Sequence, residues 1–173
     1  IARAKFWATQ AREPERHYEH KELGYNYRLS NVLAGIGRGQ LKVLEKRVKK
    51  KKYIYNYYKE AFKDIEEIEM MPVQEYDEPN YWLSCIQLKG KIKPLDILVA
   101  LEKENIEARP IWKPMHLQPF YKDYDFITTK QAGSIAEDIF TTGLCLPSDT
   151  KMNDDDLQRV IKTIKKLWGE RFV

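Results

Sequence analysis

An amide, an arginine and two aromatic rings lie close together in the segment GYNYRLSN, residues 24–31. Asn26 and Arg28 are hydrogen-bond donors, and an arginine can hold a phosphate through two parallel hydrogen bonds. Ser30 or Asn31 can cap a helix that follows, and a helix N-terminus attracts anions through its free N–H groups and its dipole. These residues suit a phosphate-binding site. A plain capping segment with exposed aromatic side chains explains the same pattern, and the residues alone leave both interpretations open.

The second segment that suits a ligand is the proline-rich stretch RPIWKPMHLQPFY, residues 109–121. Prolines stiffen such a loop, and the side chains between them can bind anions or stack on rings. The candidates are Arg109, Trp112, Lys113 and His116. This composition favours a polyanionic or sugar ligand. A purely structural loop is the alternative, in which His116 packs beneath a neighbouring ring.

Other patterns favour structure over chemistry. His17 and His20 are three residues apart, but no further ligand has convincing spacing, so no metal site is predicted. Cys85 and Cys145 each lie in an apolar stretch and are interpreted as buried free thiols. The glycines of the segment GIGRG, residues 35–39, follow no predicted strand, and we interpret them as sites of close helix packing.

The overall charge does not demand a polyanionic partner, because 30 basic residues are nearly matched by 26 acidic ones. A basic run over residues 46–52 precedes several tyrosines and could bind nucleic acid. On a helix this run spreads over all faces, so a solvated helix is the preferred interpretation. The chain lacks an apolar run long enough to span a bilayer, and we expect a cytoplasmic protein.

The apolar spacing predicts an α+β fold with a short, mainly antiparallel sheet covered by helices. Residues 1–30 are expected to form an extended arm, residues 31–62 one long connecting helix, and residues 63–173 a small domain. Strands are expected over 81–88, 106–109 and 144–146. Helices are expected from Pro94, over 132–140 with Gly143 as the stop, and from Asn153 as the cap.

The two ligand-suited segments together resemble the DegT/DnrJ/EryC1/StrS family of sugar aminotransferases, which use pyridoxal 5'-phosphate (PLP). The sequence GYNYRLSNVLAGIGRGQL, residues 24–41, is similar to a family pattern that starts G-x-N-x-R. Residues 109–121 are similar to the later family pattern R-P-x-x-x-P-x-H-x-x-P-x-Y. The segment NYWL, residues 80–83, also looks like the family's small-domain strand.

This resemblance implies a C-terminal small domain of a type I, aspartate aminotransferase-like enzyme that works as a homodimer with active sites at the interface. It implies transfer of an amino group, usually from glutamate, to a nucleotide-linked keto-sugar. It places Asn26 at the PLP phosphate of the partner subunit and Arg28 near cofactor or substrate phosphates. It places His116 near the nucleotide-sugar, with Arg109, Trp112 and Lys113 as weaker candidates for the same surface.

The family's Schiff-base lysine, and the aspartate facing the pyridine nitrogen, precede the region that matches Ile1. PLP chemistry needs both groups. We therefore expect this chain to be the C-terminal part of such an enzyme, with no catalytic residues of its own, and to be inactive alone. The alternatives are a regulatory or nucleic-acid-binding module that uses the basic helix, and a fragment that serves only dimerisation.

Overall fold

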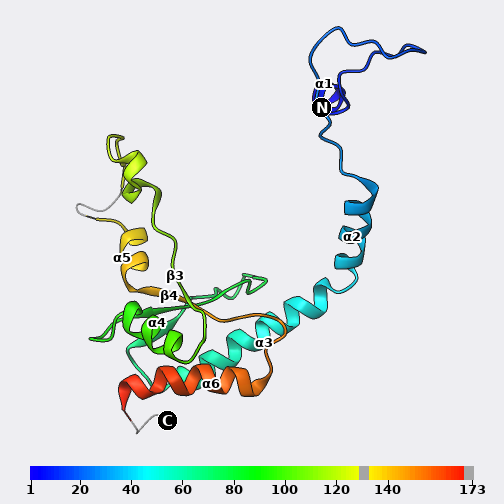
Figure 1. Cartoon of the computed structure of the whole chain (residues 1–173). Coiled ribbons are helices and arrows are strands. Elements are labelled where there is room, and N and C mark those ends of the chain that lie inside the picture. The colour runs from blue at the N-terminus through cyan, green and yellow to red at the C-terminus, as the bar shows by residue number, and fades with distance from the viewer. Residues whose placement is uncertain (129–132, 170–173) are drawn as a thin grey trace. The chain divides into compact units, whose positions relative to one another are not determined.

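The computed structural model describes residues 1–128 and 133–169. The chain divides into two compact units, Ile1–Glu45 and Lys46–Val173, and each is described by itself (Figure 1). The first unit carries Asn26 and Arg28, and the second carries the proline-rich loop.

The first unit begins with a short helix, α1 (Ala2–Ala8), which the predicted extended arm did not include. The chain then returns along the end of α1: the backbone N–H of Tyr25 donates to Trp7 O at 2.7 Å, and that of Tyr27 to Ala8 O at 3.0 Å. The expectation of a wholly extended arm is wrong. The helix α1 could not be predicted from apolar spacing, because it buries none of its residues.

Gly24 permits the closest backbone approach in this first unit. A Cβ atom at this position would lie 2.2 Å from Ala11 N and 2.2 Å from Gln10 C, which is inside their van der Waals contact distance. Ala11 is fully buried at this crossing. The glycine that begins the predicted phosphate-binding segment is therefore required by packing.

The predicted long helix is two helices, α2 (Asn31–Leu41) and α3 (Leu44–Phe62). Ser30 caps α2 as expected, with its Oγ accepting from Leu33 N at 3.3 Å. The continuous helix over 31–62 is wrong, because Lys42 and Val43 form a turn in which Val43 N donates to Gln40 O. That three-residue spacing is a 3₁₀ turn, and no proline or glycine marks the position.

Four strands form an antiparallel sheet in the order β1-β2-β4-β3 in the second unit. Their bounds are β1 Ile68–Met70, β2 Ser84–Leu88, β3 Arg109–Pro110 and β4 Gly143–Leu146. The strand predicted from Tyr81 starts later, because Tyr81 has a φ of 52°, a left-handed conformation that interrupts extended backbone. The strand predicted over 106–109 is shifted to β3. Gly143 ends the helix α5 (Ile135–Thr142) as predicted, and its extended backbone also opens β4.

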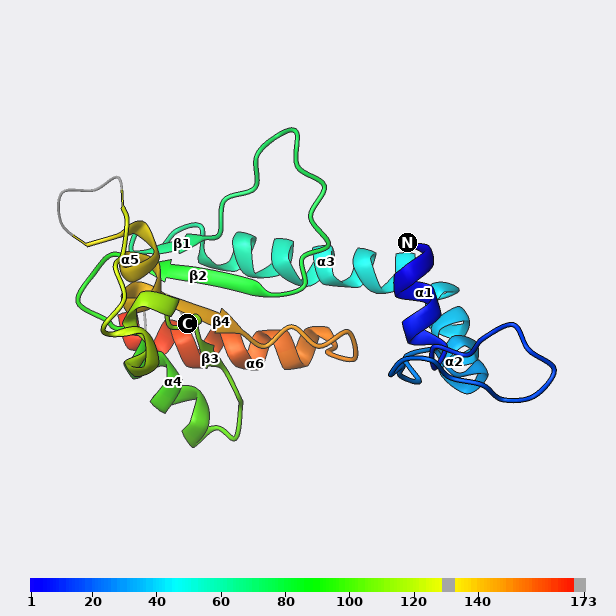
Figure 2. The same ribbon diagram turned by 90° about the horizontal axis from the view of Figure 1, so that it is seen from above.

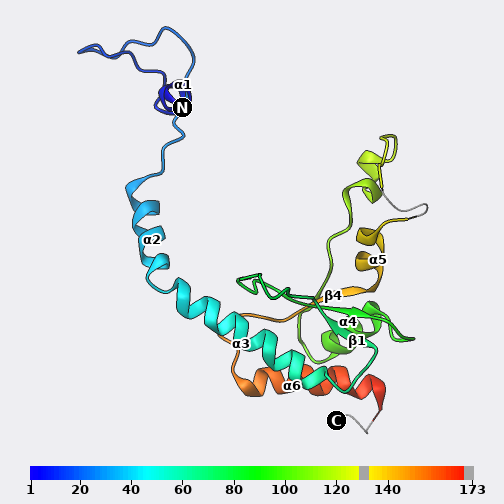
Figure 3. The same cartoon turned by 180° about the vertical axis from the view of Figure 1, so that it is seen from behind.

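Helices α3, α4 (Pro94–Lys103) and α6 (Asp154–Lys165) contribute the core with one face of the sheet. Figure 1 and Figure 3 show the sheet above α3 and α6 from opposite sides, and Figure 2 looks down on the sheet. Buried side chains from α3 include Ile54, Tyr58 and Phe62, so the second half of the expected connecting helix belongs to the core of this unit. The burial of these apolar surfaces is the main source of its stability.

Local signals predict the last helix well. Asn153 caps α6 through a reciprocal pair of hydrogen bonds with Asp156, both at 2.9 Å. The expected face of α6 is buried, with Leu157, Val160, Ile161 and Ile164 in the core. Helix α5 spans Ile135–Thr142, and its predicted start at Ala132 lies outside the described residues. Within the described ranges, no helix is both long enough and apolar enough to cross a membrane.

Candidate functional site

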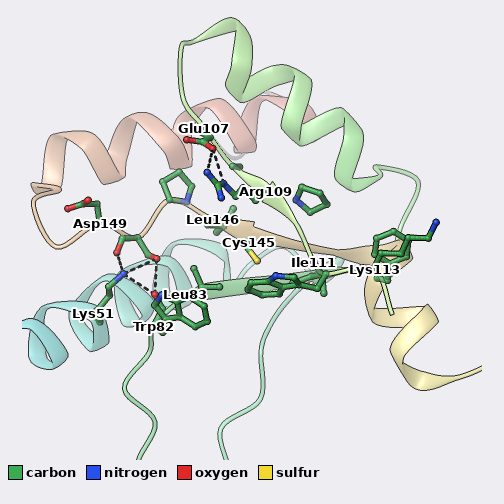
Figure 4. A pocket seen from close by; sticks show the side chains of 16 residues that line it. Lys51, Trp82, Leu83, Glu107, Arg109, Ile111, Lys113, Cys145, Leu146 and Asp149 are labelled. Atoms are coloured by element: carbon green, nitrogen blue, oxygen red, sulfur yellow. Dashed lines mark hydrogen bonds and ion pairs between the residues drawn. The ribbon is translucent and has the colours of Figure 1, made fainter. Parts of the chain in front are cut away.

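A pocket of about 640 Å³ opens in the second unit beside β3 and β4 (Figure 4). Cys145 contributes to its wall from the face of β4 that looks away from the core, because its neighbours Leu144 and Leu146 point into the core. We call this cavity the tryptophan pocket. Its lining residues are Lys51, Trp82, Leu83, Glu107, Ala108, Arg109, Pro110, Ile111, Trp112, Lys113, Phe140, Cys145, Leu146, Pro147, Ser148 and Asp149.

Two indole rings provide the flat apolar surface of this pocket. Trp82 and Trp112 are 65% and 62% exposed, and their ring centroids are 5.9 Å apart with an interplanar angle of 36°. Exposed aromatic rings at a pocket can stack on a planar or sugar ring. Trp112 was predicted from the sequence. Trp82 was not, since its own segment indicated only a strand, and its proximity to Trp112 is a result of the fold.

The charged groups of the pocket differ in whether they already form an ion pair. The Arg109 guanidinium donates from Nε to Glu107 Oε1 at 2.8 Å, and Nη2 lies 2.7 Å from the same oxygen. Both side chains are exposed, so water screens this pair and a stronger anion can compete for the arginine. Lys113 is exposed and also lines the pocket, and Figure 4 shows it apart from Arg109, beyond Ile111. Arg109, Trp112 and Lys113 thus line the same pocket, as the sequence predicted.

Lys51 is a residue of this site that sequence analysis missed. Its Nζ donates to Trp82 O at 2.9 Å and to Ser148 O at 2.5 Å, which ties α3 to the segments before β2 and after β4. Burial lowers the pKa of Lys51, and the nearby carboxylate of Asp149 opposes that shift. The basic run around Lys51 was interpreted as a solvated face, and most of its members are exposed. Only the fold distinguishes Lys51 from its neighbours.

The structure places His116 beside the pocket lining, not in it. Its Nε2 lies 3.0 Å from Glu137 Oε1, and its ring stacks on Phe126 with centroids 3.6 Å apart and planes 13° apart. The side chain is 15% exposed. A hydrogen bond from Nε2–H of His116 to the Glu137 carboxylate fixes the orientation of the imidazole ring. Nδ1 is then the remaining ring nitrogen that can form a hydrogen bond.

Asn26 and Arg28 lie in the first unit with exposed side chains. Asn26 forms an isolated antiparallel bridge with Thr9, so its backbone is fixed while its amide remains on the surface. The segment from Tyr25 to Arg28 precedes the Ser30 cap of α2, as the sequence predicted. Joint binding of a phosphate by these donors and the N-terminus of α2 stays a prediction.

Comparison with known proteins identifies the chain. The family model described as the DegT/DnrJ/EryC1/StrS aminotransferase family matches residues 3–165. The chain belongs to this family. A "putative pyridoxal phosphate-dependent aminotransferase EpsN" from Bacillus subtilis is 45% identical over 168 residues, which are 97% of this chain and 43% of that protein. A GDP-perosamine synthase from Vibrio cholerae is 30% identical over 161 residues, 89% of this chain and 41% of that one.

Solved structures agree on the fold of this aminotransferase-family chain. The Helicobacter pylori PseC, described as an aminotransferase involved in the biosynthesis of pseudaminic acid, matches with a TM-score of 0.78 at 23% identity. The match covers 94% of this chain and 44% of that one. The chain thus spans less than half of the length of these relatives.

The residues described here fit PLP only in part. Exposed donors such as the Asn26 amide and the Arg28 guanidinium suit a phosphate group. The Nζ of Lys51 donates to two backbone carbonyl oxygens, so it would have to break these hydrogen bonds to attach the cofactor covalently. Residues 1–128 and 133–169 contain no cluster of three potential metal ligands.

Proposed function

We propose that this chain is the C-terminal part of a PLP-dependent aminotransferase that moves an amino group, from glutamate, to a nucleotide-linked keto-sugar in the cytoplasm. The observation that carries the proposal is the tryptophan pocket, with two stacking rings beside Arg109 and Lys113, in a chain of the sugar aminotransferase family. The relatives' names, which include a GDP-perosamine synthase, support a nucleotide-sugar substrate.

The chain's own residues would bind and orient the reactants. We assign the nucleotide-sugar to the pocket, where Trp112 stacks on a ring and Arg109 and Lys113 face its phosphates. We assign Asn26 to the PLP phosphate of the second subunit of a homodimer, and Arg28 to nearby phosphates. PLP, when bound, supplies the electron sink for the reaction, and the covalent lysine is expected outside this chain.

The proposal is tested on the complete protein by following each half-reaction in single turnovers. Trp112→Ala should lower kcat/KM for the nucleotide-linked keto-sugar by about 5- to 150-fold, because losing one stacking ring costs about 1 to 3 kcal/mol. The half-reaction with glutamate should be unchanged, because a small amino acid does not reach this ring. Tyr76→Ala, which removes an exposed ring outside the pocket, is the control. Equal losses in both half-reactions would contradict the assignment of the pocket.

The same assay separates the two roles open to His116. If Nδ1 of His116 binds the nucleotide-sugar, His116→Ala should impair that half-reaction by a similar factor while the glutamate half-reaction keeps its rate. Glu137→Gln keeps a hydrogen-bond acceptor for the ring and should have a smaller effect. If His116 serves only to pack on Phe126, its variant should lower the melting temperature and both half-reactions together.

A further inference from the structure

Two thiols face each other across the sheet. Cys85 on β2 and Cys145 on β4 are direct partners in the antiparallel register, and their sulfur atoms are 3.7 Å apart. Both are free cysteines. Directly opposed residues of antiparallel strands have Cα atoms about 4.5 to 5.5 Å apart, which lies within the roughly 4.4 to 6.8 Å that a disulfide bridges. The spacing expected for this pair is therefore compatible with a disulfide.

The two sulfur atoms have different surroundings. Cys145 lines the tryptophan pocket, where Figure 4 shows its sulfur beside Leu146 and near Ile111. Cys85 is partly exposed but is not among the pocket residues. The hydrogen bond between the pair, in which either sulfur can be the donor, lowers the pKa of Cys145 and raises the pKa of Cys85. Cys145 is thus the thiol of the pair that ionises first, and a thiolate is the reactive form.

We propose that Cys85 and Cys145 form a redox-active dithiol that is oxidised reversibly to an intrachain disulfide by small organic disulfides such as oxidised glutathione. The Cys145 thiolate attacks one sulfur of the oxidant, which breaks its S–S bond, releases one small thiolate and leaves a mixed disulfide on Cys145. The Cys85 sulfur then gives its proton to solvent, attacks the Cys145 sulfur and releases the second small thiol. The two protein thiols are oxidised, and one small disulfide is reduced to two thiols.

This chemistry acts on the wall of the tryptophan pocket but does not depend on the proposed aminotransferase activity. On its other side, Cys145 is directly opposite Arg109 of β3. Cys145 therefore lies between Cys85 and Arg109, a cation of the pocket. The pocket is large enough to admit part of a small disulfide. The opposite face of β4 packs against the core, so a small disulfide does not reach the strand from that side. Cys145 is only 5% exposed, so we assign the pocket as the route by which a small disulfide reaches its sulfur.

The test is to expose the complete, reduced protein to oxidised glutathione without oxygen, block the remaining thiols by alkylation, and map the peptides by mass spectrometry without reduction. The expected product is one peptide pair joined through Cys85 and Cys145, and excess reduced glutathione should return both thiols. Cys85→Ser should stop at a stable glutathione adduct on Cys145. Cys145→Ser should abolish the intrachain disulfide and leave at most a glutathione adduct on Cys85.

Other outcomes would overturn the proposal. These are glutathione adducts on both cysteines of one chain, disulfides between chains, and no reaction of the folded protein under conditions that oxidise it after unfolding in guanidinium. Circular dichroism of both serine variants establishes that they are folded. Cys85→Ala and Cys145→Ala provide a second matched pair, so a folding defect in one variant does not decide the result.

Discussion

The ammonium group of Lys51 joins parts of the chain that are far apart in sequence, since its two backbone acceptors belong to Trp82 and Ser148. Both acceptors belong to residues of the tryptophan pocket. Removing the donor leaves the part-buried carbonyl oxygen of Ser148 without it, and an unsatisfied buried acceptor costs about 1 to 3 kcal/mol. Lys51 is therefore expected to stabilise the wall of the pocket.

Lys51→Met should lower the free energy of unfolding by about 1 to 3 kcal/mol, measured by urea denaturation. Lys52→Met is the matched control, because Lys52 lies next in the same helix with an exposed side chain, and it should change stability by less than about 0.5 kcal/mol. Equal effects of the two substitutions would show that the contacts of Lys51 contribute nothing beyond helix propensity.

Asn26 carries the chain's proposed contact to the cofactor. In the complete protein Asn26→Ala should weaken PLP retention by about 1.5 to 3 kcal/mol, the usual loss of a hydrogen bond to a charged group. Because the contact is assigned across the homodimer, dilution should increase the loss. PLP absorbance after dialysis measures it, with Asn56→Ala on the surface of α3 as the control. Unchanged retention would leave Asn26 as a residue of the capping segment only.

Two glycines of the first unit differ in how closely other atoms of their elements approach them. Gly24 sits where α1 and the returning chain cross, and an added Cβ would overlap backbone atoms of Gln10 and Ala11. An added Cβ at Gly37 in α2 would meet no atom within 4 Å apart from its chain neighbours and the backbone of its own helix. The proposed close packing of the α2 glycines has no partner within the described first unit, and it stays a prediction.

Gly24→Ala should separate the returning segment from the end of α1. Hydrogen exchange of the amides of Tyr25 and Tyr27, which donate to Trp7 and Ala8, should then become faster. Gly37→Ala in the same chain should leave that exchange unchanged and strengthen α2, because alanine favours a helix over glycine by about 1 kcal/mol. Protected amides at both tyrosines in Gly24→Ala would show that the crossing adapts to a methyl group.

At the scale of the whole α+β unit, the helices fill one face of the sheet, and the tryptophan pocket lies against the ends of β3 and β4. Tyr58 is fully buried in that core, stacked on Phe62, and its hydroxyl donates to Pro147 O at 2.8 Å. Burial raises the pKa of Tyr58 above its ordinary value of 10.0. The core thus contains a group whose ionisation opposes folding.

Alkaline solution should therefore destabilise the protein through Tyr58. Above about pH 10 the unfolded chain releases this proton while the folded chain keeps it, so stability falls as pH rises, by up to about 1.4 kcal/mol per pH unit. Tyr53 acts in the same direction, since its hydrogen bond to Asp154 raises its pKa to about 12. Urea unfolding between pH 9 and 11 should show a shallower decline in Tyr58→Phe than in the exposed control Tyr76→Phe. Parallel declines would exclude Tyr58 as the cause.

Local sequence signals determined much of this molecule. The cap of α6 at Asn153, its buried face and the cap of α2 at Ser30 depend on residues three or four positions apart, so they could be predicted without knowing the fold. The grouping of Arg109, Trp112 and Lys113 was predictable because one short loop carries all three. The family patterns were equally legible, because they are contiguous stretches of sequence.

Only the tertiary structure decided the rest of the site. Lys51 and its acceptor on Trp82 are 31 positions apart, and the two cysteines are 60 apart. Their meeting depends on the register of β2 with β4 and on the side of the sheet against which α3 packs. A shift of one residue in that register would turn every side chain of a strand to the other face. The register is set by burial of the whole core, a property that no short stretch of the sequence carries.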